Sequence, residues 1–393
     1  MRYMTLATII AGISGFVVII VAAWAFGDNT AKAEEFTAYW GLFFAGTGVL
    51  TGLMQETTRT VATPSQVENR ARPMVVGIWI ALAIAVVIAT TGWWWAPQII
   101  SEHRLPGIFL LSLGLGSYTI QAVVGGILSG KKLWSRYALL ITLDTGSRMV
   151  LAIIAWLLGW QLLAFMVITV MGAVSWVIIL ATRPGIDVYA DIDTRRFVRR
   201  ALTSMAASGA TAVLIVGFPT IVKFVHSEPS TVPAAAIIYA VTLTRAPLLV
   251  PLQQFQSTLI VRFVHGSPVR TPLLIVWVCG ILGSITAYAL GPWLMVTILG
   301  SAYAIPAWLL GALTIGATCT ASLMITGAAA LAREQHGTYL LGWVVATLIA
   351  VIVLATNLPL EIASCAALTL GPLSGLGVQL CGVGDRKQEK STV

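Results

Sequence analysis

The sequence predicts an all-α polytopic membrane protein with about 12 transmembrane helices. Hydrophobic residues make up 58% of the 393-residue chain and charged residues only 10%, whereas a soluble domain carries about 25% charged residues. Apolar runs long enough to cross the ~30 Å hydrocarbon core of a bilayer recur from one end of the chain to the other. No nucleotide-binding loop, metal-ligand cluster or nucleophile–base motif accompanies them. We therefore expect no cofactor, no bound metal and no enzymatic activity.

The predicted spans follow one another with short loops. We expect them at about 4–26, 36–58, 74–96, 106–129, 137–159, 161–182, 202–225, 234–261, 272–297, 304–331, 338–356 and 358–382. The joins near 159–161 and at Asn357 are very tight, so ten or eleven spans with a re-entrant segment is the alternative. The first apolar run is longer than the core of a signal peptide, which favours an uncleaved helix.

Lysine and arginine are concentrated in alternate loops, and these residues predict the orientation. The positive-inside rule then puts both termini in the cytoplasm of a bacterial inner (plasma) membrane. The net charge of +8 is explained by topology and gives no support to nucleic-acid binding. The loops that carry the basic residues contain Arg59, Arg70 and Arg72; Lys131, Lys132 and Arg136; Arg183, Arg195, Arg196, Arg199 and Arg200; Arg262 and Arg270; and Arg333.

Two halves of the chain resemble each other at an offset of about 199 residues. Gly52-Leu53-Met54-Gln55 aligns with Pro251-Leu252-Gln253-Gln254, and Leu128-Ser129-Gly130 aligns with Ile325-Thr326-Gly327. We expect an N-terminal six-helix lobe at 1–182, a basic cytoplasmic linker at 183–200, a C-terminal six-helix lobe at 201–382 and a cytoplasmic tail at 383–393. With an even number of spans per repeat, the two bundles should be related by a pseudo-two-fold axis along the membrane normal.

An arginine lies near the middle of one predicted span in each half. Arg148 falls inside Leu140–Gly159, and Arg245 falls inside Ala236–Phe255. A guanidinium at the bilayer midplane costs about 2.5–3.5 kcal/mol on insertion scales, so it must face protein, water or an anion. Arginine cannot lose its proton to avoid this cost. The pair therefore predicts a cavity for a negatively charged group.

These features resemble the multidrug/oligosaccharidyl-lipid/polysaccharide (MOP) exporter superfamily, and above all its polysaccharide-type (Wzx-like) flippases. The resemblance lies in the two six-span halves, in Phe36–Arg59, in Gly125–Trp134 and in Thr244–Gln256. It implies alternating access and a cationic central cavity that takes a polyprenyl-phosphate-linked sugar. The predicted function is therefore a flippase that moves a polyprenyl-(pyro)phosphate-linked saccharide to the outer leaflet for cell-wall or surface polysaccharide assembly.

Further polar residues in the spans are candidates for binding this substrate. Asp144 lies one helical turn before Arg148, so the two form either a purely structural ion pair or part of the mechanism. Arg245 either lines the cavity or caps carbonyls that a kink at Pro247 and Pro251 would release. Gln253 and Gln254 follow it and offer neutral groups to a sugar. For each of the others a structural role is the alternative: interfacial for Glu56, snorkelling for Lys223, helix–helix hydrogen bonding for Gln55 and Gln121, and an aromatic belt for Tyr39.

Two other functions stay open at the level of sequence. A multidrug/cation antiporter of the same superfamily would use Asp144 and leave Arg245 dispensable. The other is a non-transporting scaffold for cell-envelope assembly. The expected partners of the flippase are the lipid-linked sugar, membrane lipids and glycosyltransferases of the same pathway, with the protein itself a monomer.

Overall fold

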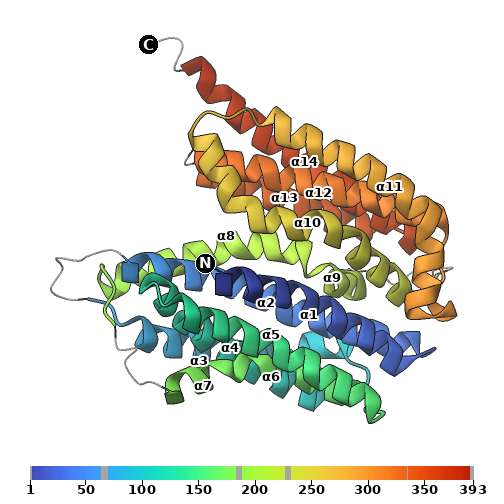
Figure 1. The fold of residues 1–393 in the computed structure, drawn as a ribbon, viewed down its shortest axis with the longest axis horizontal. Helices are drawn as coiled ribbons and strands as arrows, with labels where there is room; N and C mark the ends of the chain where they lie inside the picture. The colour runs from blue at the N-terminus through green and yellow to red at the C-terminus, as the bar shows by residue number, and fades with distance from the viewer. Residues whose placement is uncertain (1, 63–69, 183–187, 226–231, 334, 390–393) are drawn as a thin grey trace. The chain divides into compact units, whose positions relative to one another are not determined.

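The structure is a computed structural model that describes residues 2–62, 70–182, 188–225, 232–333 and 335–389, without the side chains of 2–9, 253–258, 261, 336 and 382–389. The described part of the chain is helical and holds no strand, as predicted (Figure 1). The chain divides into two compact units, 1–220 and 221–393. The predicted all-α fold with two bundles is confirmed.

The helices match the predicted spans closely. The first unit contains α1 (Arg2–Phe26), α2 (Thr30–Ala62), α3 (Pro73–Ile99), α4 (Arg104–Gly130), α5 (Trp134–Leu157), α6 (Leu162–Met171), the 3₁₀ turn η1 (Gly172–Val174), α7 (Ser175–Thr182) and α8 (Thr194–Ile215). Next, α9 (Phe218–Val225) runs across the boundary between the units. The second unit continues with α10 (Ala234–Val264), α11 (Arg270–Leu299), η2 (Ser301–Tyr303), α12 (Ala307–Ala332), α13 (His336–Leu354) and α14 (Leu360–Glu389).

Ten helical segments of the described chain are long and apolar enough to cross a membrane, and the pair α8–α9 makes an eleventh if it counts as one span. That pair is bent by 71° at residues 216–217, so the predicted span 202–225 is broken. In α1 only Ile10–Phe26 is described with side chains, and this part is apolar but shorter. The chain is a multi-pass membrane protein.

The packing within each unit repeats, as the sequence repeat predicts. In the first unit α4 packs against α2, α3 and α6, and in the second unit α12 packs against α10, α11 and α14. In an apolar 18-residue stretch of each helix, 89% of the α12 stretch is buried, against 6% of the α11 stretch. Large apolar side chains on α11 are exposed, which in a membrane protein marks the lipid-facing surface. Each repeat thus surrounds one central helix.

Small hydroxyl residues allow α12 to be buried in this way. Thr314, Thr318 and Ser322 each donate their hydroxyl to the carbonyl four residues earlier, at 2.8–2.9 Å. Such bonds satisfy the hydroxyl inside the helix, so the side chain needs no partner in the hydrocarbon region.

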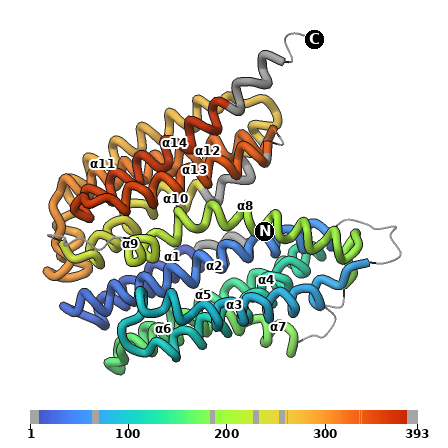
Figure 2. The backbone as a smooth tube through the Cα atoms, turned by 180° about the vertical axis from the view of Figure 1, so that it is seen from behind, coloured from blue at the N-terminus to red at the C-terminus, as the bar shows by residue number. Residues whose placement is uncertain are grey.

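The α8 helix packs along α2, and both views show the two helices side by side (Figure 1; Figure 2). The approach is so close that a Cβ at Gly52 would overlap the carbonyl oxygen of Ser204. Because α8 belongs with α2, the first unit ends after α8, later in the chain than the linker predicted at 183–200.

The segment before α8 is held by backbone hydrogen bonds. Ala190 donates to the carbonyl of Ala71 at 2.8 Å, and Ala71 donates to the carbonyl of Ile192 at 2.9 Å. Asp193 caps the helix, because its Oδ1 accepts the backbone N–H of Arg196 at 3.0 Å. Of the residues predicted as a linker, 194–200 therefore form the first two turns of a long helix.

Candidate substrate-binding residues

Arg148 lies in the interior of the first unit, where protein groups surround its charge. Its Nη2 is 2.9 Å from Oδ1 of Asp144, and its Nε donates to the carbonyl of Thr169 on α6 at 2.9 Å. The guanidinium carbon lies 5.5 and 5.2 Å from the ring centroids of Phe43 and Phe44 on α2. Only 2% of the Arg148 side chain is exposed. These contacts favour the structural alternative for the Asp144–Arg148 pair over a lining of an open cavity.

A break in the neighbouring helix supplies part of this environment. The α6 helix ends at Met171, and the 3₁₀ turn η1 separates it from α7. Beside the break, the carbonyl of Thr169 accepts from Arg148, and the carbonyl of Ala173 accepts from the Ser117 hydroxyl on α4 at 2.8 Å. In a membrane such side-chain donors satisfy carbonyls that a helix break leaves free. Arg148 thus binds a backbone carbonyl beside a helix break.

Gly172 is a residue of this site that the sequence did not single out. A Cβ at this position would overlap the carbonyl oxygen and Oδ1 of Asp144 and Cζ of Arg148. Only glycine lets η1 pass this close to the ion pair. The sole sequence signal is the small-residue run Gly172-Ala173 inside an apolar segment.

Arg245 lies in the second unit, inside α10, which corresponds to α2 in the repeat and not to the α5 helix that carries Arg148. Its side chain is 5% exposed. The helix continues without interruption through Pro247 and Pro251 to Val264. Arg245 therefore keeps a permanent positive charge in the middle of a membrane helix, about 16 Å from the helix start at 1.5 Å per residue. The side chains of Gln253 and Gln254, predicted to continue this site, lie outside the described residues.

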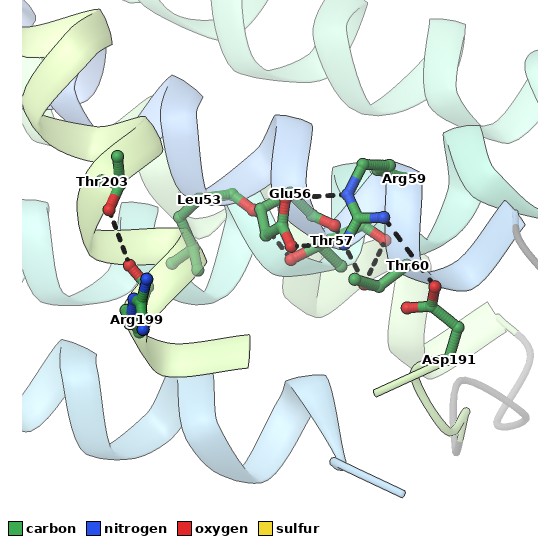
Figure 3. Close-up of polar contacts among 8 residues, drawn as sticks. All are labelled: Leu53, Glu56, Thr57, Arg59, Thr60, Asp191, Arg199 and Thr203. Atoms are coloured by element: carbon green, nitrogen blue, oxygen red, sulfur yellow. Dashed lines mark hydrogen bonds and ion pairs between the residues drawn. The ribbon is translucent and has the colours of Figure 1, made fainter. Parts of the chain in front are cut away.

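Glu56 belongs to a cluster at the end of α2 (Figure 3). Its Oε1 and Oε2 accept from Nη2 and Nε of Arg59 at 2.7 and 3.0 Å. Nη1 of Arg59 lies 3.8 Å from Oδ2 of Asp191, in the segment that precedes α8. Glu56 is 6% exposed and Arg59 44% exposed. The geometry supports the interfacial role of Glu56 that the sequence left as its alternative, and the cluster ties α2 to the segment before α8.

The other predicted residues lie in different environments. Tyr39 is fully buried between α2 and α4, and its hydroxyl donates to the carbonyl of Gly107 at 3.3 Å, so it presents no free ring face to a sugar here. Gln55 is exposed, and Lys223 on α9 is half-buried. Gln121 on α4 is 5% exposed, and its Oε1 accepts no hydrogen bond from the described residues.

Two further buried carboxylates accept hydrogen bonds from backbone N–H groups, and the sequence analysis did not predict them. Glu35 Oε1 accepts from the N–H of Ser101 at 3.0 Å, and Glu361 Oε1 accepts from the N–H of Val232 at 3.0 Å. Each lies near the start of its helix, α2 or α14, and each binds a segment next to another span. Their signal in the sequence is an acidic residue at the start of an apolar run. No group of three or more His, Cys, Asp and Glu within the described ranges could hold a metal ion.

Solved structures of transporters share this fold. An inward-facing multidrug resistance MATE family transporter of the MOP superfamily is similar with a TM-score of 0.72 and 14% identity, over 95% of this chain and 96% of that chain. The outward-facing conformation of a multidrug resistance MATE family transporter gives 0.62 and 15%, over 100% and 96%. A MOP superfamily transporter from Pyrococcus furiosus, whose binding pocket is described as having reverse polarity, gives 0.63 and 15%, over 98% and 95%. The fold is therefore that of MOP-superfamily membrane transporters.

Sequence comparison gives the family within this fold. No protein-family model matches the chain. "Uncharacterized protein Rv3630" of Mycobacterium tuberculosis is 37% identical over 388 residues, which cover 95% of this chain and 89% of the relative. "Uncharacterized protein Mb3654" of Mycobacterium bovis has the same identity and coverage, and "Uncharacterized protein Rv1510" of Mycobacterium tuberculosis is 37% identical over 89% of this chain and 84% of its own length. The chain belongs to the family of these mycobacterial proteins.

Proposed function

We propose that this protein is a flippase that moves a polyprenyl-(pyro)phosphate-linked saccharide from the cytoplasmic to the outer leaflet of the inner membrane. The observation that carries the proposal is the polarity of the interior. The buried side chains include a permanent cation, Arg245, in the middle of α10. In this proposal the phosphate of the substrate binds Arg245, because a guanidinium matches phosphate oxygens in bidentate geometry.

The buried acids of the described residues support an anionic rather than a cationic substrate. Glu35 and Glu361 accept backbone N–H groups, Glu56 is held by Arg59, and Asp144, itself only 13% exposed, is held by Arg148. A carboxylate already occupied by a donor is a poor site for a cationic drug, because the drug must first displace that donor. The MOP-superfamily relative with the pocket described as having reverse polarity is a precedent, within the fold, for a change in the charge of the pocket.

The substrate is expected to come from membrane glycosyltransferases that build the lipid-linked sugar. Arg148 has its Nε and Nη2 engaged by Thr169 and Asp144, so it would reach a phosphate only after the pair opens. We assign the primary contact to Arg245, whose charge lies in the middle of α10, and to Arg148 a role in holding α5 against α6.

The test is headgroup translocation of a polyprenyl-phosphate-linked sugar in proteoliposomes. We expect Arg245→Gln to lower the rate by at least about 100-fold, since removal of a charge-assisted phosphate contact costs roughly 3 kcal/mol. Arg245→Lys should keep part of the rate, because it retains the charge and loses the planar fork. Arg262→Gln removes an exposed charge from the last turn of the same helix and should transport normally. A normal rate in folded Arg245→Gln would overturn the proposal.

Multidrug export is a second candidate, favoured by the similarity to multidrug resistance MATE transporters and by the carboxylate of Asp144 inside the first unit. In that case Asp144→Asn would abolish the efflux of a cationic dye and Arg245→Gln would leave it unchanged. Dye efflux and headgroup translocation, measured for both variants in the same proteoliposomes, distinguish the two functions.

A further inference from the structure

Four arginines occupy the first two turns of α8, and all four are exposed: Arg195, Arg196, Arg199 and Arg200. The opposite face of these turns and the next, with Phe197, Ala201 and Met205, is buried. The helix is fixed here by the cap from Asp193 and by the backbone bonds of the segment before it. The basic face is therefore presented in a defined orientation.

The four arginines are placed unfavourably with respect to the dipole of α8. The N-terminal end of a helix carries a partial positive charge, so cations in the first turns are unfavourable there. Asp193 lies 3.3 Å from Nε of Arg196. Within the described residues, no ion pair involves Arg195, Arg199 or Arg200. An anion from outside the chain would remove this conflict.

Two of the arginines line an open groove together with apolar side chains. The groove has a volume of about 710 Å³ and is lined by Thr194, Arg195, Val198, Arg199, Leu202 and Thr203. In Figure 3, Arg199 and Thr203 lie apart from the carboxylates of Glu56 and Asp191, which face Arg59 instead. The groove thus combines guanidinium groups with apolar carbon surface.

The position along α8 fits the membrane surface. After its two basic turns the helix continues through the mainly apolar residues 201–215, so those turns lie where a span meets the headgroup layer. The positive-inside rule explains why basic residues occur on one side of the membrane, but any position in a loop would satisfy it. It does not explain two arginines one turn apart that line a groove with Val198 and Leu202.

We propose that this groove binds an anionic glycerophospholipid, with Arg195 and Arg199 on its phosphate and Val198 and Leu202 against its acyl chain. The proposal is independent of the transported substrate. The ligand is a lipid of the surrounding membrane, which holds the start of α8 at the interface.

The experiment is a titration of phosphatidylglycerol onto the full-length, delipidated protein in detergent, with bound lipid counted by native mass spectrometry. Arg195→Gln/Arg199→Gln should weaken binding by about 30-fold, because each of the two basic residues near an anionic headgroup contributes roughly 1 kcal/mol. The matched control is Arg196→Gln/Arg200→Gln, which removes the same charge from the same two turns outside the groove, and it should weaken binding clearly less than the first variant, because neither side chain lines the groove. Arg195→Lys/Arg199→Lys retains the charge and should bind nearly as the wild type.

Three outcomes would overturn the proposal. Equal losses in the two glutamine variants would mean diffuse attraction rather than a groove, and phosphatidylcholine binding as tightly as phosphatidylglycerol would exclude recognition of charge. Displacement of the lipid by inorganic phosphate at equal concentration would identify a general anion site. If Arg195→Gln/Arg199→Gln does not fold, the wild type alone is tested. Phosphatidylglycerol should then bind more tightly than phosphatidylcholine, inorganic phosphate at equal concentration should not displace it, and about 0.5 M NaCl should weaken the binding of phosphatidylglycerol only.

Discussion

The ion pair of Arg148 and Asp144 shows how a charge is accommodated inside a membrane bundle. A carboxylate, a backbone carbonyl and two phenylalanine rings surround the guanidinium, so protein groups compensate its charge. Removal of one partner of such a pair leaves the other buried and unmatched, which typically costs about 3–5 kcal/mol. Asp144 and Arg148 both lie on α5, so it is the hydrogen bond from Arg148 to the carbonyl of Thr169 that connects α5 to α6.

Gly172 offers a test of this arrangement that leaves both charges in place. Gly172→Ala should lower the free energy of unfolding by about 1–3 kcal/mol, because the added methyl group overlaps Asp144 and Arg148. Gly146→Ala is the matched control in α5, since nothing lies within 4 Å of a Cβ there. It should be neutral or stabilising by up to about 1 kcal/mol, as helix propensity predicts. Thermal unfolding in detergent measures both, and equal midpoints for the two variants would contradict the packing shown around Gly172.

Among the elements, α8 shows how contacts outside a helix hold its N-terminal end. Its N-terminal turns are held by Asp193, by the bonds between 71 and 190–192, and by the close packing of Ser204 on Gly52. The hydrogen bond from the backbone of Arg196 lowers the pKa of the Asp193 carboxyl below its usual value of 3.8. The cap is therefore strongest when this carboxyl is ionised.

This pKa shift gives the α8 cap a defined pH dependence. A carboxyl with a lowered pKa in the folded state stabilises fully above its unfolded value, and the contribution is lost as the pH falls below about 3.8 toward the folded value. Hydrogen exchange at 194–197 should therefore accelerate in Asp193→Ala at pH 6, with a smaller difference from the wild type at pH 3. Asp193→Asn keeps an acceptor without a charge and should remain protected at both pH values. The same difference for Asp193→Ala at both pH values would contradict the role of the ionised cap.

At the scale of the whole molecule, the pattern of buried and exposed residues is that of a protein surrounded by lipid rather than by water. The central helices α4 and α12 are rich in small and hydroxyl residues, while α3 and α11 carry large apolar side chains outward. This arrangement is expected where lipid covers the outer surface, because lipid is as apolar as the side chains that face it.

Two leucines on neighbouring helices test this inside-out distribution. Leu313 on α12 is 1% exposed and Leu282 on α11 is 60% exposed. Leu313→Ala should destabilise by about 2–5 kcal/mol through the cavity it leaves, while Leu282→Ala should fall within about 0.5 kcal/mol of the wild type. Unfolding in nanodiscs compares the pair directly. A larger loss for Leu282→Ala would mean that α11 packs against protein rather than lipid.

The sequence by itself determined the class of the protein, most of the span positions, the repeat and the spacing of Asp144 and Arg148. Apolar length, periodic composition and i, i+4 spacing are properties of one segment, so they can be read without knowing what lies beside it. Only the tertiary structure decided that α8 packs along α2, that Gly172 and Thr169 complete the Arg148 environment, that Tyr39 is buried against Gly107, and that Glu35 and Glu361 hold backbone N–H groups. Each of these features joins residues far apart in the chain, and their meeting depends on how whole helices pack rather than on any local pattern.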